Sequence, residues 1–498
     1  MKKFIYATLA VAAVLLFASC KNDKNQPKAE AGDAYVSFTF NLPQGGTRAG
    51  VDDKHASDLY AGTKDEQKIT AVRVVLFDED SKLVKYALDY AITGDGENPV
   101  DGDDKVGTST AAKFTTKAKE VVTQDYLMLA IINPTAEVKA ATEVNKTLLD
   151  AQAAITTDAT KLSAAGILMS NDRGLVKVKS TNMKTVATDA EAAPVSVNVD
   201  RILAKVFVGG DPTFANGKLT NIKWQLNTTN KKTFIYRQFG QVNTGLNTFV
   251  DETAGDNSTR FDRYAKDPNF SGAFNAADFN YLEGVPTLTG TTGFEDAKGQ
   301  YCLENTMDAT SQKIQQTTTF ILSGNWTPAE HDGITFAEGQ TWYYWKGWSF
   351  TKAKMLEYKT IIDDASNAKT EIDETPAGFK AALKAAFAAG LTVDAQGDVT
   401  AAGTFGEVQA YKDGFCYYQS NLIRHFNDAQ SKADMGYGRY GVVRNNIYKI
   451  NLKKISRPGT PTVTNDENND KNDDPSKSYI SFDVSVNPWI VREQDIEL

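Results

Sequence analysis

The sequence predicts a mainly β fold, with two β-sandwich domains in series and only a few short helices. Short apolar or alternating runs recur along the chain, as at residues 72–77, 126–132 and 195–199. Turn residues such as Asn-Pro and Gly-Gly-Asp-Pro follow these runs, and such clusters are typical of strand ends. Helical spacing of apolar residues is found in two stretches, residues 146–154 and 377–389. A chain of 498 residues is long enough for two domains of ordinary size.

The first domain is predicted from its strands. Residues 72–77 and 83–84 flank an acidic turn, which indicates a hairpin, and the apolar run 126–132 indicates a buried strand. The alternating run at 195–199 continues until the Gly-Gly pair at 209–210 breaks the chain. We therefore place the domain boundary there and assign residues 49–210 to the first domain and residues 211–455 to the second.

The second domain is predicted from runs rich in β-branched and aromatic residues. Its clearest helix places Phe379, Leu383 and Phe387 four residues apart, on one helix face. The strand candidates are residues 222–226, 233–236, 317–322 and 444–452.

The first twenty residues predict export as a lipoprotein. Lys2 and Lys3 precede an apolar stretch, and two small residues stand directly before Cys20. Residues 1–20 therefore form a signal peptide, and Cys20 becomes the acylated (palmitate-bearing) first residue of an outer-membrane lipoprotein precursor. Simple cleavage beside an incidental cysteine is the alternative. Residues 21–33 are polar, as expected for a tether, and no later stretch is long and apolar enough to cross a membrane.

Composition excludes several classes of function. A net charge of -9 and an isoelectric point near 5.2 argue against a nucleic-acid partner, which requires a basic surface. The three histidines, His55, His331 and His425, show no metal-ligand spacing, and no catalytic or nucleotide-binding motif occurs. We expect no enzyme activity, no metal and no cofactor. Cys302 and Cys416 are expected as two separate buried thiols, with a disulfide between them as the alternative.

A dense aromatic group at residues 342–348 offers a rival function. Its tryptophans could stack on sugar rings, in which case the protein would be a monomeric outer-membrane surface lipoprotein that binds glycans and loses affinity with Trp345→Ala. Packing in the core or at a subunit contact is the favoured interpretation of this group.

The two ends of the chain carry similar strands. Residues 456–478 are rich in Asp and Asn and predict a linker, which leads to a terminal segment at residues 479–498. Both this segment and the one that begins at Tyr35 open with Tyr, a β-branched residue, Ser and Phe, alternate strictly, and end at a proline. The apolar face comprises Val36, Phe38, Phe40 and Leu42 in the first segment, and Ile480, Phe482, Val484 and Val486 in the second.

We interpret the two segments as alternative occupants of one groove, although chance similarity between short strands is an alternative. Burial of four large apolar side chains contributes about 6–12 kcal/mol for either segment, so a covalently attached N-terminal strand excludes a foreign one. Arg48, the first arginine, lies in a loop of small residues suited to proteolysis, and a cut before Ala49 would free the strand. The groove could then accept residues 479–491 of another copy, which generates a head-to-tail filament.

The chain resembles the fimbrillin, or type V pilin, family of Bacteroidales, and within it the shaft subunits of minor (short) fimbriae. The residues that carry the resemblance are the signal ending at Cys20, residues 47–50, 199–206 and 440–448, and the tail residues Val486 to Trp489 and Asp495 to Leu498. The resemblance implies two tandem transthyretin-like β-sandwich domains, maturation by an arginine-specific protease at Arg48–Ala49, and a C-terminal donor strand that includes Trp489. It also implies a cell-surface fimbrium that supports adhesion and biofilm formation. The implied partners are further copies of the chain, anchor and tip fimbrial subunits, and surface ligands of host or bacterial cells.

Overall fold

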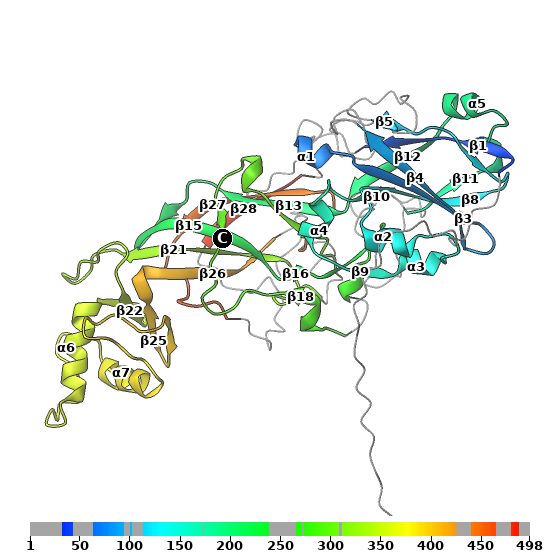
Figure 1. Ribbon diagram of the computed structural model, residues 1–498. Coiled ribbons are helices and arrows are strands. Elements are labelled where there is room, and N and C mark those ends of the chain that lie inside the picture. Colours follow the sequence, from blue (N-terminus) through cyan, green and yellow to red (C-terminus); the bar gives the residue numbers. More distant parts are fainter. Residues whose placement is uncertain are drawn as a thin grey trace, which may run out of the picture.

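The computed structural model describes residues 32–42, 63–93, 100–101, 113–172, 174–238, 265–270, 273–307, 311–423, 425, 440–464 and 480–487. The fold is mainly β with short helices, as the sequence predicts (Figure 1). Within the described part of the chain, every helix is too short or too polar to span a membrane.

One large sheet dominates the first half of the molecule. Among the described residues it has nine strands, in the order β5 (Val100–Asp101), β4 (Val84–Thr93), β3 (Ala71–Asp78), β8 (Tyr126–Ile132), β10 (Met169–Asn171), β12 (Val195–Arg201), β2 (Phe38–Asn41) and β6 (Lys113–Thr115), with β11 (Val176–Val178) also paired to β8. A second pairing joins β1 (Ala34–Val36) to β7 (Lys119–Val121). Both pairings contribute side chains to one core, which includes Val72, Val74 and Leu76 of β3.

The opposite face of β3 and β8 is covered by short helices. Val75 of β3 and Leu129 of β8 pack there with Val138 and Ala151, so both strands are buried on both sides. Thr135, Thr147 and Asp158 accept backbone hydrogen bonds at the helix starts, which explains why the helices begin where they do. These helices are α2 (Ala136–Ala141), α3 (Leu148–Gln152) and α4 (Ala159–Ser163), and the same half contains α1 (Lys64–Gln67), α5 (Ala187–Ala192), β9 (Ala154–Thr156) and the 3-10 turn η2 (Ser180–Asn182).

The second half contains two sheets that pack face to face. The first has the order β14 (Thr213–Phe214), β27 (Ile447–Ile455), β13 (Leu203–Gly209) and β20 (Gln300–Leu303), with β28 (Ile480–Asn487) also paired to β27. The second has the order β19 (Gly290–Thr291), β15 (Gly217–Asn227), β21 (Thr319–Pro328) and β26 (Phe415–Leu422). Val206 and Tyr448 of the first sheet share a core with Trp224 and Leu322 of the second, as in a β-sandwich.

An α/β unit is inserted between β21 and β26 and lies at the end of the molecule away from the first half (Figure 1). It has its own core, in which Tyr343, Trp345 and Trp348 pack against Phe379 and Met355. The apolar spacing in the sequence predicts α7, but the sequence predicts neither α6 nor a separate unit here. The unit comprises β23 (Trp348–Thr351), β22 (Trp342–Trp345), β25 (Val408–Tyr411) and β24 (Gly403–Phe405) in sheet order, with α6 (Lys352–Asp363) and α7 (Phe379–Ala388).

Short connecting elements complete the second half: β16 (Thr229–Asn230) with β18 (Phe279–Asn280), β17 (Lys232–Phe234), and the 3-10 turns η4 (Pro268–Phe270), η5 (Ala276–Asp278), η6 (Asp296–Lys298) and η8 (Lys412–Gly414). β17 pairs with β9, so the second half of the chain also contacts the first through backbone hydrogen bonds.

The chain leaves the first sheet at Ile202, upstream of the boundary predicted at residue 210, because β13 pairs with β20 and β27 of the second half. The predicted linker also begins differently. Its residues 456–464 pack on the second half, where the Thr460 amide donates to the Tyr417 carbonyl over 2.8 Å and Val463 is buried. Residues 465–478 of that linker lie outside the described residues.

Candidate functional site

The N-terminal segment is an interior strand of the first sheet. β1 pairs antiparallel with β7, and β2 lies between β12, to which it is parallel, and β6, to which it is antiparallel. A strand hydrogen-bonded on both sides cannot be removed without exposing backbone groups of both neighbours. We call the space that this segment fills, between β12 and β6 and beside β7, the N-terminal groove.

One face of the segment is fully buried. Val36 is 1% exposed, Phe38 and Phe40 are 0% exposed, and Leu42 packs partly buried against the same core. Phe40 stacks on Phe114 of β6 with the ring centroids 6.0 Å apart. The four residues that the alternation pattern singled out therefore share one face and one core.

Ser37 separates β1 from β2 and was not singled out in the sequence. It is 1% exposed, and its hydroxyl donates to the Thr116 carbonyl over 2.7 Å. The Phe38 amide donates in turn to the Thr116 hydroxyl over 3.0 Å, and the Val195 amide donates to the Ser37 carbonyl over 2.8 Å. The serine thus satisfies buried polar groups where the segment changes its pairing partners. The sequence feature that could have indicated this role is the serine at the same position in both terminal segments, Ser37 and Ser481.

The chain after the segment re-enters the described structure at α1. Glu66 of this helix is buried, and its carboxylate accepts from the Lys205 ammonium over 2.6 Å and from the Tyr301 hydroxyl over 2.5 Å. Burial alone would raise the pKa of Glu66, but the Lys205 charge and these hydrogen bonds bring it below its ordinary value. The predicted lipidation residue Cys20 and the predicted cleavage residues Arg48 and Ala49 lie outside the described residues.

The C-terminal strand β28 runs antiparallel along β27, from Ile480 opposite Ile455 to Asn487 opposite Ile447. The other edge of β27 pairs with β13 and β14, so β28 is an edge strand of this sheet as far as the described residues show. The isolated chain thus keeps its C-terminal strand on its own second half. Trp489, which we expected in the donor strand, lies outside the described residues.

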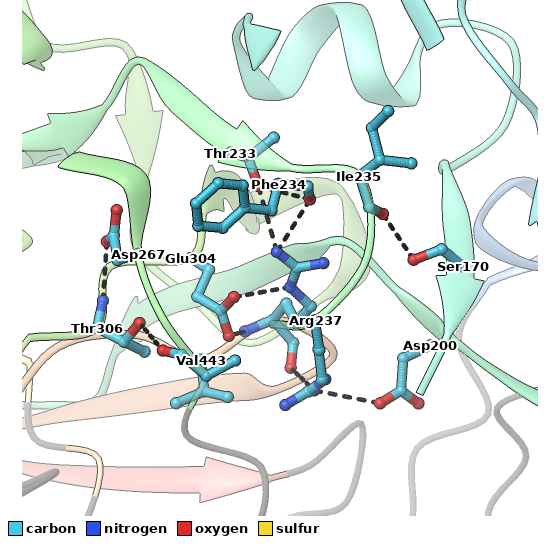
Figure 2. Close-up of polar contacts among 12 residues, drawn as sticks. Ser170, Asp200, Thr233, Phe234, Ile235, Arg237, Asp267, Glu304, Thr306 and Val443 are labelled. Atoms are coloured by element: carbon cyan, nitrogen blue, oxygen red, sulfur yellow. Dashed lines mark hydrogen bonds and ion pairs between the residues drawn. The ribbon is translucent and has the colours of Figure 1, made fainter. Parts of the chain in front are cut away.

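Buried polar contacts join the two halves between the groove and the C-terminal strand (Figure 2). Asp200, at the end of β12, accepts from Arg237 over 3.1 Å and from Asn445 over 2.9 Å. Arg444 donates to Glu304 over 2.8 Å, and Arg237 also donates to the Arg444 carbonyl. The conspicuous block at residues 440–448 therefore lies at the junction, where it links the strand that borders the groove to the strand that carries β28.

The residues considered for other chemistry are structural. Trp342, Trp345 and Trp348 are 2%, 5% and 9% exposed, so their rings are packed in cores and do not form a platform for sugars. Cys302 and Cys416 are both buried and free, as the favoured interpretation held. The described residues contain no group of three or more His, Cys, Asp or Glu side chains that could hold a metal ion.

Two family models match the sequence, and each describes a fimbrial subunit protein. The model "Major fimbrial subunit protein (FimA)" matches residues 34–201, and the model "Major fimbrial subunit protein type IV, Fimbrillin, C-terminal" matches residues 409–495. Together they span about half of the chain. The first match contains the N-terminal groove, and the second contains β27 and β28.

Two solved structures of fimbrial proteins are similar to this chain at low sequence identity. A fimbrilin (fimA) from Porphyromonas gingivalis has 15% identity and a TM-score of 0.42, with 93% of this chain and 99% of that chain covered. The tip fimbrial protein Mfa3 from Porphyromonas gingivalis, with a C-terminal truncation, has 10% identity and a TM-score of 0.35, with 90% of this chain and 99% of that chain covered. No curated protein matches the sequence significantly.

Proposed function

Since the chain belongs to the fimbrillin family of fimbrial subunits, which is not an enzyme family, we propose that it is the shaft subunit of a cell-surface fimbria and polymerises by donor-strand exchange. The precursor is exported as a lipoprotein acylated at Cys20. An arginine-specific protease cuts after Arg48 and frees the N-terminal segment. The C-terminal strand of a second copy then fills the N-terminal groove. Because such contacts do not close, they extend head to tail until anchor and tip subunits end the fibre.

The observation that carries this proposal is the position of the N-terminal segment as an interior strand. Its position in the N-terminal groove is stabilised by three buried side chains, Val36, Phe38 and Phe40, which contribute about 1.5–3 kcal/mol each. Loss of the strand would expose an apolar groove and unpaired backbone groups on both borders. Such an opened sheet is a template for pairing with another chain.

The C-terminal strand matches the groove in length and pattern. β28 has eight residues, the same span as β1 and β2 with Ser37 between them. When Tyr479 is aligned with Tyr35, Ser481 falls at the position of Ser37. A donor strand in this register would offer a hydroxyl to the Thr116 carbonyl that Ser37 satisfies in the precursor. As an edge strand, β28 also has fewer pairings to lose when it leaves its own chain.

Cleavage at Arg48 is supported by the surroundings of the next arginine. Arg73 lies within β3 and is 3% exposed, with its guanidinium held by Asp89 over 2.6 Å and by Glu143 over 3.1 Å. A protease that acts on the folded chain would not reach it. After a cut at Arg48, the remaining chain stays attached at α1 through the buried Glu66–Lys205 pair.

The test is N-terminal sequencing of protein sheared from cells, together with gel analysis of its polymers. The wild-type chain should begin at Ala49 and form a ladder of oligomers. Arg48→Ala should remain an uncut monomer, and Arg48→Lys, which keeps the charge, should also resist an arginine-specific protease. A wild-type surface protein that begins at acylated Cys20 and is monomeric would refute the proposal. The rival function, a monomeric glycan binder, has lost its basis in the tryptophans because those rings are buried.

A further inference from the structure

The polar positions of the N-terminal segment are unevenly buried. Four polar residues alternate with the apolar ones: Tyr35, Ser37, Thr39 and Asn41. Of these four, Ser37 is buried, with 1% of its surface exposed, whereas the other three are partly exposed. The N-terminal groove is therefore most restrictive at this one polar position, which we call the Ser37 site.

The Ser37 site requires a small hydrogen-bond donor. The Ser37 hydroxyl donates to the Thr116 carbonyl over 2.7 Å. The backbone beside it is already paired, since the Thr116 amide donates to the Phe38 carbonyl over 2.9 Å and the Val195 amide donates to the Ser37 carbonyl over 2.8 Å. A carboxylate at this site would be buried and would face the Thr116 carbonyl without a proton to donate. A tyrosine ring would not fit a close-packed space that a serine fills.

The two outer positions are held by side-chain hydrogen bonds that depend on the direction of the strand. At the start, the Tyr35 hydroxyl donates to the Glu120 carboxylate over 2.9 Å, and the two residues are directly opposite each other in the pairing of β1 with β7. At the other end, the Asn41 amide donates to the Asn198 side chain over 2.9 Å across the parallel pairing of β2 with β12. A strand that keeps the first contact must place a tyrosine beside β7.

The sequence of the C-terminal strand excludes most shifted alignments. A one-residue shift turns its apolar face away from the core. A two-residue shift places either Asp483 or Tyr479 at the Ser37 site. A four-residue shift that brings Ser485 to the site also brings Pro488 into the middle of the strand, where β2 is paired on both sides and a residue without an amide hydrogen is disfavoured.

A reversed strand is the remaining alternative. It would also bring Ser485 to the Ser37 site, but Asn487 would then take the position of Tyr35. Tyr479 would lie beyond the opposite end of the groove, so the tyrosine contact with β7 would be lost. The hydrogen bonds along β12 would also have to change from the parallel to the antiparallel pattern.

We propose that the N-terminal groove accepts the C-terminal strand of another copy in one register and one direction. Tyr479 takes the position of Tyr35, Ser481 enters the Ser37 site, and the strand runs parallel to β12. The Ser37 site selects the register, and Glu120 selects the direction. This inference rests on the proposed strand exchange and adds the partner that the groove prefers, an alternating strand with a serine at its buried polar position.

The first experiment compares peptides of residues 479–491 for uptake by chain cut at Arg48. Ser481→Asp should require a concentration about a hundredfold or more above that of the wild-type peptide, because its carboxylate would be buried without a donor. Ser485→Asp carries the same charge at the partly exposed position of Asn41 and should require about threefold more or less than that. Ser481→Ala should require about tenfold more peptide, and Ser485→Ala is its matched control.

The second experiment measures the register directly by disulfide formation. Asn198 is exposed and lies opposite Asn41, so the cut chain is prepared with Asn198→Cys. Four peptides each carry one cysteine: Ser481→Cys, Asp483→Cys, Ser485→Cys and Asn487→Cys. The Ser485→Cys peptide should cross-link fastest, because Ser485 takes the position of Asn41 in the proposed register. The native Cys302 and Cys416 are buried, which limits competing reactions.

The outcomes distinguish this inference from strand exchange itself. Fastest cross-linking of Asp483→Cys or Asn487→Cys would show a two-residue shift, and fastest cross-linking of Ser481→Cys would show a reversed strand. Either result, or equal uptake of the Ser481→Asp and wild-type peptides, would overturn the proposed register and leave strand exchange intact. Absence of uptake of every peptide, the wild type included, would refute strand exchange and this inference with it.

Discussion

Truncation of Phe40 tests whether the N-terminal segment competes for the groove. Phe40 is 0% exposed and stacks on Phe114, so Phe40→Ala removes buried area and leaves a cavity. Such a substitution costs about 3–5 kcal/mol. Once the chain has been cut at Arg48, the segment is held only by noncovalent contacts, and the whole loss falls on its retention. Since each 1.4 kcal/mol is a factor of ten, we expect retention to weaken by about a hundredfold to a thousandfold or more.

The assay uses chain cut at Arg48 and challenged with a labelled peptide of residues 479–491. Phe40→Ala should take up the peptide at a concentration about a hundredfold lower than the wild type, while both uncut proteins should exclude it. Thr39→Ser is the control, because Thr39 lies on the opposite strand face and its hydroxyl pairs with Thr115 over 2.8 Å. Equal uptake by cut wild type and cut Phe40→Ala would refute the view that the two segments share one groove.

Three further predictions concern the second half. Burial raises the pKa of Asp267 from an ordinary value of 3.8 to about 7, so the native state keeps a proton that the unfolded chain loses. The free energy of unfolding should therefore fall as pH rises from about 4 to about 7, more steeply than in Asp267→Asn, as measured by urea titration. Arg444→Met leaves Glu304 buried without its cation and should cost about 3–5 kcal/mol in the same assay, whereas Arg444→Met with Glu304→Gln should recover part of that loss. Burial raises the pKa of Cys302 and Cys416 to about 12, so these two thiols should resist iodoacetamide at pH 8 in the native protein and react only in denaturant, as judged by mass spectrometry of their peptides.

Period-two patterns made the terminal strands and much of the first sheet predictable. A strand with one buried face has an apolar residue at every second position, as Val36, Phe38 and Phe40 show. Strands that are buried on both faces, such as β3 and β8, instead have nearly continuous apolar runs. Both patterns depend only on the sequence of the strand itself, so they can be recognised without knowledge of the partner strands.

Features that depend on distant contacts could not be predicted. β12 and β13 look like one continuous strand in the sequence because Ile202 alone separates them, so the residue pattern does not reveal the change of sheet. On α6 only Met355 and Tyr358 are buried, which leaves a weak helical pattern. Ser37 looks like any strand serine until Thr116 is placed beside it.

The junction explains why buried charges occur in a protein whose proposed role is structural. A buried ion pair adds little net stability compared with apolar packing, and its directional geometry is what apolar contacts lack. Asp200 lies one residue before the end of the strand that borders the groove, and Arg237 and Arg444 fix its position relative to β27. In a fibre joined by strand exchange, tension between one groove and the next would cross this junction, where the backbone passes directly from β12 to β13 through Ile202. Apolar surfaces could slide under such a load, whereas the paired guanidinium groups hold one relative placement. The Arg444 variants separate these two effects. If the double variant, Arg444→Met with Glu304→Gln, recovers its free energy of unfolding but its fibres are less stiff than wild-type fibres, then the Arg444–Glu304 pair fixes the relative placement of the two halves and does not act through stability.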